Sequence, residues 1–441
     1  MRRSGKSADS EPVTLREYQY LCIDSKGRGG YVEIEESTFE DLEEFIKRNR
    51  KDDDGSLDEL LALTYRKGIG DCIQARNYVG VIAMRDGTTI QILPKVSLAD
   101  TSEEDDDARD EGLFLKMLQA VFRIPMRSSG QAALKLHHMG IFEAFISMYL
   151  EEADRLVKQG LRSDYVPIEE NANCLKGRLL FTKNVRANAA HKERFYVCHD
   201  EYSLDRPENR IIKATLLLLG RVSNSEANRN AVKAILPAFA EVNSPKNVDA
   251  DLSLAKSRSD RNMSAYERLL IWSAIFLKGE SFSTFHGREV SMALLFPMET
   301  LFECYVASSL RQYMRKNYRG YSVKTQAASK YLFDTPKKGL LRPDIVCSKG
   351  EERTVVLDTK WKRLNSESSI SQADLYQMYA YSKKYQTKET VLVYPATSAM
   401  QDKSPHYDAD DDVHVKVFMY DLTNEGDSLE ELSKIIIGRD Y

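Results

Sequence analysis

The sequence predicts a multidomain protein of the α+β and α/β classes, in which an N-terminal β-rich and helical region precedes a C-terminal α/β domain. Three observations predict this class. The chain has 441 residues, which is too many for one ordinary hydrophobic core. Segments with strand-like alternation are interspersed with segments of helical periodicity. The content of 42% hydrophobic and 29% charged residues is typical of a globular protein.

The first part of the chain has the pattern of a small α+β domain, placed at residues 13–98. Residues 1–12 are polar and aperiodic, so we expect them to be disordered. Alternating runs between Thr14 and Glu36 predict strands. Helical periodicity predicts two helices, at residues 38–49 and 57–65.

The clearest hairpin of the chain spans Asn77 to Val96. Two alternating strands flank Arg85-Asp86-Gly87 there, and Asp-Gly is a strong turn signal. The acidic run at residues 99–111 follows, and we expect it to be a flexible linker.

The middle of the chain, residues 112–285, is expected to be a helical and β-rich region. Helical periodicity marks residues 112–123, 137–159, 205–219, 228–242 and 265–277. Strands are expected at residues 164–181 and 195–202, with a turn at Lys176-Gly177-Arg178. We expect a domain boundary near residues 279–287 and a C-terminal domain at residues 286–441. The last elements of this domain are expected to be strands near 390–394 and 413–420 and a helix near 428–437.

Two carboxylates and an ammonium are expected to converge in this C-terminal domain. Val355-Val356-Leu357 is β-branched and apolar, which predicts a buried strand. Side chains alternate along a strand, so Asp358 and Lys360 leave it on the same face. A turn at Lys349-Gly350-Glu351-Glu352 would place Asp344 beside Asp358.

These residue types suit a magnesium site with Asp344 and Asp358 as ligands. Magnesium, or manganese as an alternative, prefers oxygen ligands, and one or two carboxylates with a substrate phosphate are enough to hold it. Lys360 would orient or activate a water molecule, or stabilise charge that develops on the phosphoryl group. The alternative is an ordinary exposed ion pair, because Asp-x-Lys is common on strands.

Two helices are expected beside the carboxylates. The first, residues 297–310, places Glu303 away from its apolar stripe, where it would be an additional carboxylate at the site. The second, residues 371–381, places Gln377 and Tyr381 four residues apart on one face. Core packing is the alternative role of the tyrosine.

The order of these elements resembles the PD-(D/E)xK nuclease superfamily, in its RecB-like branch. Further segments resemble the McrC family, the nuclease subunits of the McrBC 5-methylcytosine-specific restriction systems. They are Asn77–Ile82, Ile92–Lys95, Leu175–Leu179, Asp205–Arg210, Leu301–Glu303 and Asp358–Lys362. The resemblance runs from about Tyr78 to about Pro395 and covers most of the chain.

The resemblance implies a magnesium-dependent endonuclease that cuts double-stranded DNA, with catalytic residues Asp344, Asp358, Lys360 and Glu303. The residues expected to contact or position DNA are Gln377, Tyr381, Arg342, Trp361 and Lys362.

The resemblance also implies a partner, a hexameric AAA+ GTPase like McrB, on which residues 112–285 would dock. In that region Lys176, Arg178 and Arg210 are the candidates for contact, and turn or salt-bridge roles are the alternative. The chain has no Gly-x-x-x-x-Gly-Lys-Ser/Thr loop, so we expect it to bind no nucleotide itself.

Charge and composition narrow the function classes further. The net charge of −4 excludes a uniformly basic nucleic-acid binder. From Ser291 to Met400, however, 17 Lys and Arg stand against 10 Asp and Glu, a local excess of +7 that suits phosphate binding. The absence of a long apolar run, of a signal peptide and of Cys-x-x-Cys predicts a cytoplasmic protein with reduced cysteines and no membrane partner.

Two alternative functions remain open from the sequence. One is an autonomous RecB-like DNA nuclease that needs no GTPase. The other is a non-catalytic subunit that assembles or activates the GTPase. Cleavage by the isolated chain distinguishes the first, and intact Asp344, Asp358 and Lys360 argue against the second.

Overall fold

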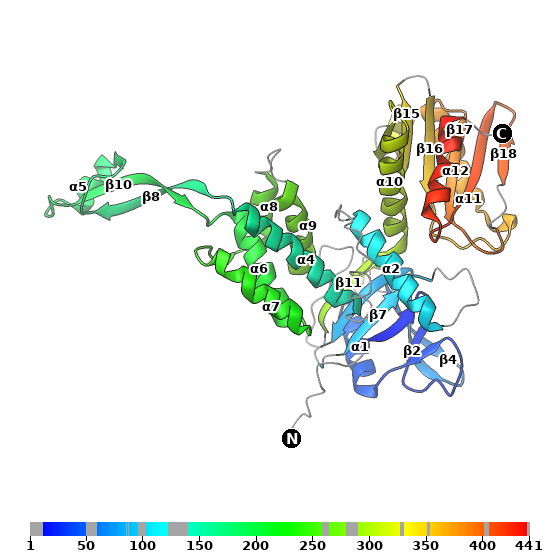
Figure 1. Ribbon diagram of the computed structural model, residues 1–441, viewed down its shortest axis with the longest axis horizontal. Coiled ribbons are helices and arrows are strands. Elements are labelled where there is room, and N and C mark those ends of the chain that lie inside the picture. Colours follow the sequence, from blue (N-terminus) through cyan, green and yellow to red (C-terminus); the bar gives the residue numbers. More distant parts are fainter. Residues whose placement is uncertain are drawn as a thin grey trace. The chain divides into compact units, whose positions relative to one another are not determined.

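The computed structural model describes residues 12–49, 60–84, 86, 88–95, 103–121, 140–257, 264–278, 290–326, 330–350, 353–400 and 405–438. Contacts gather these residues into two units, coloured along the sequence in Figure 1. Unit 1 combines Ser10–Ile141 with Phe285–Tyr441, and unit 2 is Phe142–Thr284. No helix in the described ranges is long and apolar enough to cross a membrane.

Unit 1 begins with two small sheets that share one hydrophobic core with helix α1 (Glu36–Asn49). The first sheet contains, in spatial order, β1 (Val13–Arg16), β7 (Thr89–Leu93), β6 (Tyr78–Met84) and β11 (Val290–Pro297). The second contains β3 (Tyr31–Glu33), β2 (Tyr20–Cys22), β5 (Gly70–Ala75) and β4 (Leu61–Arg66). The early strands, the helix after them and the hairpin of β6 and β7 confirm the prediction, although Arg85, Gly87 and Val96 lie outside the described residues.

Two predictions in this part of the chain were wrong. Residues 61–66 form strand β4 instead of the second half of a helix at 57–65, of which residues 57–59 lie outside the described ranges. Antiparallel pairing with β5 buries Leu61 and Ala62, so tertiary pairing overrides the local helical pattern.

The acidic run expected to be a linker at residues 99–111 is helical from its fifth residue. Helix α2 covers Glu103–Val121, whereas residues 99–102 lie outside the described ranges. Asp110 is buried and pairs with Arg16 Nε at 3.3 Å, and Glu111 accepts a hydrogen bond from Gln91. Arg16 and Gln91 of the first sheet therefore hold acidic side chains that the composition of the run had suggested were exposed to solvent.

Strand β11 joins the first sheet, although its residues were expected to lie in the C-terminal domain that opens at residue 286. It pairs antiparallel with β6 from Met84↔Val290 to Tyr78↔Pro297. Gly80 permits the close approach, because a Cβ atom there would lie 1.9 Å from the carbonyl oxygen of Leu294, at a φ of +145°. Strands from both sides of the predicted domain boundary thus belong to the same sheet.

The second half of unit 1 is built on a six-stranded mixed sheet. Its spatial order is β12 (Ser322–Thr325), β15 (Ile345–Lys349), β16 (Arg353–Thr359), β17 (Glu389–Pro395), β19 (Val413–Tyr420) and β18 (His406–Ala409). The three central strands, β16, β17 and β19, run parallel, and the outer pairs are antiparallel. A separate hairpin, β13 (Lys330–Asp334) with β14 (Lys337–Leu341), precedes β15.

Helices cover both faces of this sheet. Helix α11 (Gln372–Tyr385) packs Met378 and Tyr381 onto Val356 and Leu392. Helices α10 (Met298–Asn317) and α12 (Glu425–Ile437) pack against each other and contact the sheet, where the ring of Phe302 lies 6.3 Å from that of Tyr420. The helices and strands predicted after residue 297 are confirmed.

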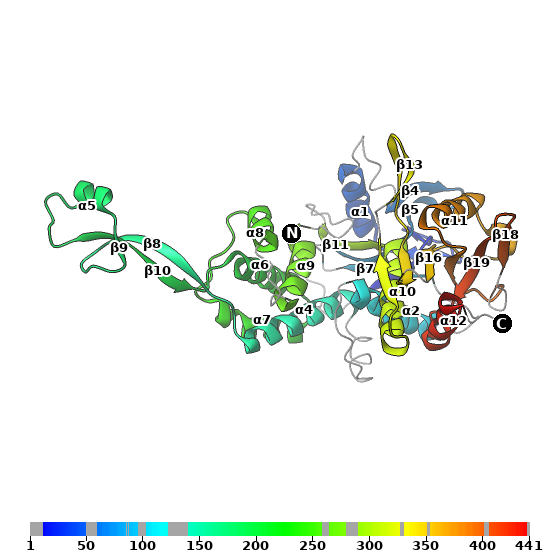
Figure 2. The ribbon, with the colours of Figure 1, turned by 90° about the horizontal axis from the view of Figure 1, so that it is seen from above.

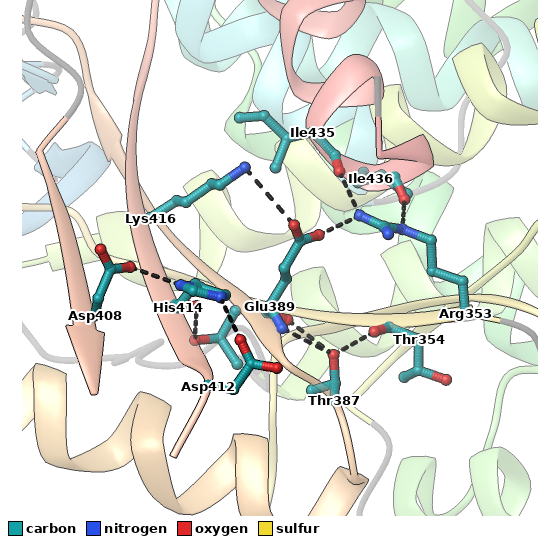
Figure 3. A network of polar contacts seen from close by, with 11 residues as sticks. Arg353, Thr354, Thr387, Glu389, Asp408, Asp412, His414, Lys416, Ile435 and Ile436 are labelled. Carbon is teal, nitrogen blue, oxygen red and sulfur yellow. Dashed lines mark hydrogen bonds and ion pairs between the residues drawn. The ribbon is translucent and has the colours of Figure 1, made fainter. Parts of the chain in front are cut away.

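A polar network anchors α12 to the sheet, as Figure 3 shows. The Arg353 guanidinium donates to the carbonyl oxygens of Ile436 at 2.7 Å and Ile435 at 3.1 Å, and it pairs with Glu389. These bonds satisfy carbonyls at the end of a helix, which have no partner within it. Nearby, the His414 ring lies between two surface carboxylates of the β18–β19 hairpin.

Unit 2 combines a helical bundle with a projecting arm. The bundle consists of α4 (Gly140–Gln159), α6 (Pro207–Val222), α7 (Glu226–Ile235), α8 (Val248–Ser257) and α9 (Ser264–Lys278), with a short 3-10 turn at Leu236–Phe239. The arm is the antiparallel pair of β8 (Asp164–Ala172) and β10 (Phe195–Ser203), with β9 (Arg178–Leu179) and α5 (Phe181–Ala187) at its tip. Figure 2 shows the arm extending from the bundle. Helices α5 and α8 were not predicted, and the strand expected at residues 164–181 is shorter, because β8 ends at Ala172 and Phe181 begins α5.

Candidate functional site

The pairing of β15 with β16 brings two aspartates together. Ile345 pairs with Leu357, so Asp344, one residue before β15's first position, comes beside Asp358 near the end of β16. Asp344 Oδ2 accepts two hydrogen bonds of 2.7 Å, from the Thr359 backbone N–H and from its hydroxyl. Asp358 is only 2% exposed. The expected position of Asp344 is therefore confirmed.

Lys360 lies on the same side of the strand as Asp358. Its Nζ atom is 2.6 Å from Asp358 Oδ2 and donates to Gln377 Oε1 at 3.1 Å. Gln377 in turn donates to the Tyr381 hydroxyl at 2.8 Å. The structure thus brings Lys360, Gln377 and Tyr381 together as the sequence predicts, and the amide of Gln377 holds the lysine in place.

Glu303 approaches the aspartates from α10. Its Oε1 atom accepts a hydrogen bond of 3.3 Å from the Gln326 side chain, whose residue also donates its backbone N–H to the Asp344 carbonyl oxygen at 2.9 Å. Gln326 thus joins the α10 carboxylate to the loop that carries Asp344. Gln326 was not predicted, because it lies in a polar stretch with no motif.

Burial raises the pKa of all three acids, and repulsion by neighbouring carboxylates adds to the shift for Glu303 and Asp358. Burial, and then the charge of Asp344, raise the pKa of Glu303 to about 7 and that of Asp358 to about 6. Burial also raises the pKa of Asp344, although the two Thr359 hydrogen bonds oppose it. For Lys360, burial lowers the pKa, but the neighbouring carboxylates outweigh burial and the net pKa is raised. The lysine is therefore charged at neutral pH, beside acids that resist ionisation.

This donor set fits a hard divalent cation. Asp358 Oδ2 is buried, and the Lys360 ammonium lies 2.6 Å from it. Within the described ranges no three His, Cys, Asp or Glu side chains are grouped to hold an ion, and the site offers the two carboxylates of Asp344 and Asp358. Such a set suits magnesium or manganese, which retain water, and not a structural zinc.

The other residues expected to contact DNA have different surroundings. Arg342 is exposed beside Asp344. Lys362 is 52% exposed in its side chain and lies 3.1 Å from Asp374 Oδ2, which also accepts a bond of 3.0 Å from the Tyr394 hydroxyl. The Trp361 indole N–H is directed at Glu17, an acid that sequence reasoning missed.

The three residues expected to contact a partner lie in unit 2. Lys176 and Arg178 are exposed on the arm, where Lys176 Nζ is 3.5 Å from Glu170 Oε1. Between them Gly177 adopts a φ of +62°, and a Cβ atom there would lie 2.5 Å from the Cys198 carbonyl oxygen. The turn is therefore built on glycine.

Arg210 lies on α6 and not on the arm. Its guanidinium donates two hydrogen bonds of 2.7 Å to the Asp205 carboxylate, and this bidentate contact lowers the pKa of Asp205. A second carboxylate, that of Asp251, is 3.7 Å away. The alternative of a salt-bridge role agrees with this geometry.

Comparison with known proteins finds one family model and solved structures that are similar to this chain. Residues 73–395 match the family model described as McrBC 5-methylcytosine restriction system component. A chain in the refined half-complex from the tetradecameric assembly of Thermococcus gammatolerans McrB AAA+ hexamers with bound McrC has 20% identity and a TM-score of 0.65, over 97% of this chain and 100% of that one. At that identity the likeness shows the fold.

A second solved structure is more distant. A chain of the cryo-EM structure of the Thermococcus gammatolerans McrBC complex has 19% identity and a TM-score of 0.49, over 69% of this chain and 88% of that one. No curated protein matches the sequence.

Proposed function

The chain belongs to the family of McrBC 5-methylcytosine restriction system components, and from that premise we propose that it is the DNA endonuclease subunit of a GTP-dependent restriction system. The observation that carries the proposal is the convergence of Asp344, Asp358 and Lys360 at the ends of two paired strands. An ordinary surface ion pair does not bury its aspartate to 2% exposure beside a second carboxylate.

Asp344 and Asp358 are the residues that would hold magnesium. When bound there, the ion supplies Lewis-acid polarisation of a phosphodiester and a lowered pKa for bound water. The Lys360 ammonium offers its protons to the attacking water or to a phosphoryl oxygen on which negative charge develops. Gln377 accepts from that ammonium and so restrains its direction. Glu303, with a pKa of about 7, is able to take up a proton at neutral pH.

The charge of the surrounding sequence supports binding to double-stranded DNA. The stretch from Ser291 to Met400 carries the local excess of +7, and exposed Arg342 and Lys362 lie directly beside the site in the sequence. We assign both to contacts with the phosphate backbone.

We assign the partner-binding role to unit 2, and in particular to its arm. The relatives in solved assemblies accompany McrB AAA+ hexamers, and this chain has no nucleotide-binding loop. The tip of the arm exposes apolar side chains that no part of unit 2 covers, with Phe181 73% exposed. Such a surface is typical of a protein interface. The partner we propose is a hexameric AAA+ GTPase like McrB.

Plasmid cleavage in the presence of magnesium tests this function. Wild type, Asp358→Asn and Lys360→Met are compared with and without the AAA+ partner and GTP. We expect wild type to cut only with both, and each variant to cut about a thousandfold more slowly because about 4 kcal/mol of barrier lowering is lost. Binding of the partner and stimulation of its GTP hydrolysis remain. Lys47→Met, on the surface of α1, is the matched control and cuts like wild type.

Each contrary result identifies a different error. Variants that cut like wild type would show that Asp358 and Lys360 are not the site. Cleavage by the isolated chain would favour the autonomous nuclease. A wild-type chain that stimulates the GTPase yet never cuts would favour the non-catalytic assembly subunit.

A further inference from the structure

Trp361 links the proposed nuclease centre to the N-terminal sheets of unit 1. It directly follows Lys360, and its indole N–H lies 3.2 Å from both carboxylate oxygens of Glu17. Glu17 follows strand β1 and is only 1% exposed. Its Oε2 atom also accepts the Lys95 backbone N–H at 3.0 Å. A single buried carboxylate therefore joins the end of β1, the end of β7 and the residue next to the catalytic lysine.

Trp361 has a second contact that leads back to the same centre. Its ring lies 5.4 Å from that of Phe302, which is fully buried on α10 and directly precedes Glu303. The sequence neighbours of Lys360 and of Glu303 thus pack against each other. A displacement of the Trp361 ring would therefore act on the backbone that carries Lys360 and on the turn of α10 that carries Glu303.

We propose that Glu17, through Trp361, is a positioning residue by which the N-terminal sheets set the placement of Lys360 and Glu303. The inference rests on the nuclease function proposed above. Its physical basis is the cost of a buried carboxylate that loses its donors, which gives the contact two distinct states, made or broken. A catalytic group misplaced by about 1 Å can lose a hundredfold in rate.

The two tryptophans of the chain allow a direct test in the full-length protein. Trp272 lies in unit 2, so Trp272→Phe leaves Trp361 as the sole tryptophan. In that background Glu17→Leu removes the acceptor at similar volume. We expect a red-shifted Trp361 emission, stronger quenching by acrylamide, and a cleavage rate at saturating DNA lowered about ten- to a hundredfold. Binding of the AAA+ partner stays unchanged.

Two further variants separate positioning from general damage to the fold. Glu17→Gln keeps an acceptor oxygen, so it restores most of the rate and the emission of Trp361. Gln91→Leu removes a buried polar side chain from the same sheet without touching Trp361, and it leaves both readouts as in the parent protein.

A double-mutant cycle decides whether both residues act through one contact. Trp361→Phe keeps a ring against Phe302 but loses the N–H, so Glu17→Leu combined with Trp361→Phe should cut no more slowly than the worse single variant. Losses that multiply, or a slow Glu17→Leu variant with unaltered Trp361 emission, overturn the proposal. If wild type never cuts, the proposed nuclease function is wrong. The contact between Glu17 and Trp361 is tested separately, because an unaltered Trp361 emission in Glu17→Leu contradicts it whether or not the protein cuts DNA.

Discussion

Three consecutive residues after β16 are each held by an acid from a different element. Lys360 pairs with Asp358 of β16, Trp361 donates to Glu17 after β1, and Lys362 pairs with Asp374 of α11. The sequence predicted a catalytic role for Lys360 and contacts with DNA for Trp361 and Lys362. The structure holds this segment through three separate acids, and such preorganisation is what the catalytic role proposed for Lys360 requires.

At the scale of single residues, we also expect the buried carboxyl group of Glu17 to make the stability of unit 1 depend on pH. Burial raises the pKa of Glu17 to about 7, although the hydrogen bonds from the Lys95 backbone N–H and the Trp361 indole N–H oppose this shift. The folded state therefore holds the proton more tightly than the unfolded state. The stabilisation that comes from protonated Glu17 is therefore complete below about pH 4.5, and it is lost as the pH rises through 7.

Urea unfolding followed by Trp361 emission in the Trp272→Phe background measures this loss. Between pH 5 and pH 8 the free energy of unfolding should fall by about 2–3 kcal/mol more than in the Glu17→Gln variant. Glu40→Gln, an exposed carboxylate on α1, should keep the pH dependence of the parent protein. Equal pH dependences for the parent and Glu17→Gln would show that Glu17 titrates normally.

The difference between predicted and unpredicted site residues has a physical reason. Asp358 and Lys360 follow from the alternation of one strand, and Gln377 and Tyr381 from one turn of one helix. Asp344 needs only a short hairpin. Glu17 and Gln326 reach the site through contacts between elements distant in sequence, and periodicity carries no information about such contacts.

At the scale of elements, the arm of β8 and β10 is a paired ribbon nine residues long in each strand. An isolated two-stranded ribbon has little core of its own, and side chains at its tip gain burial only from another molecule. The helix α5 at the tip buries none of its residues. Its apolar side chains are therefore available to the proposed partner.

Substitution at the tip tests that role. Phe181→Ser combined with Val185→Ser should weaken binding to the AAA+ partner at least tenfold, measured as Kd by fluorescence anisotropy, because two apolar contacts are lost. Tyr65→Ser on β4 removes an equally exposed aromatic residue from unit 1 and should leave the Kd unchanged. An unaltered Kd in the double variant would place the interface elsewhere.

Elements with a clear local pattern were predicted correctly. Elements whose structure depends on a pairing strand or on a side chain from another element were not. The hairpin of β6 and β7 and the helices α10 and α11 have clear periods and were correctly predicted. Residues 61–66 are a strand because β5 pairs with them. The acidic start of α2 is ordered because Arg16 and Gln91 bind its carboxylates.

At the scale of the whole molecule, unit 2 is an insertion in unit 1. The chain leaves unit 1 after α2, forms the bundle and the arm, and returns with β11 to complete a sheet that began at β1. The sequence indicated several domains and their order, but it gave no sign that β11 pairs with β6. That pairing depends on residues more than two hundred positions apart.

Gly80→Ala tests how much unit 1 depends on this closure. The new Cβ atom would collide with the Leu294 carbonyl, so β11 has to move, and we expect Tm to fall by at least several degrees. Gly112→Ala in α2 is the matched control, since its Cβ meets nothing within 4 Å, and it should stabilise by about 1 kcal/mol. Differential scanning calorimetry compares the two, and a Gly80→Ala protein as stable as wild type would contradict the steric argument.

The late arrival of β11 has a consequence for synthesis on the ribosome. About 200 residues separate the end of β6 from the start of β11, so translation at 5–20 residues per second leaves the outer edge of β6 unpaired for roughly 10–40 s. An unpaired edge invites pairing with another nascent chain. The bundle and arm are complete before that edge is covered, and the chain then has to bring its two halves together over an already folded insertion. A chaperone that covers this edge before β11 is made would therefore protect the nascent chain from such pairing.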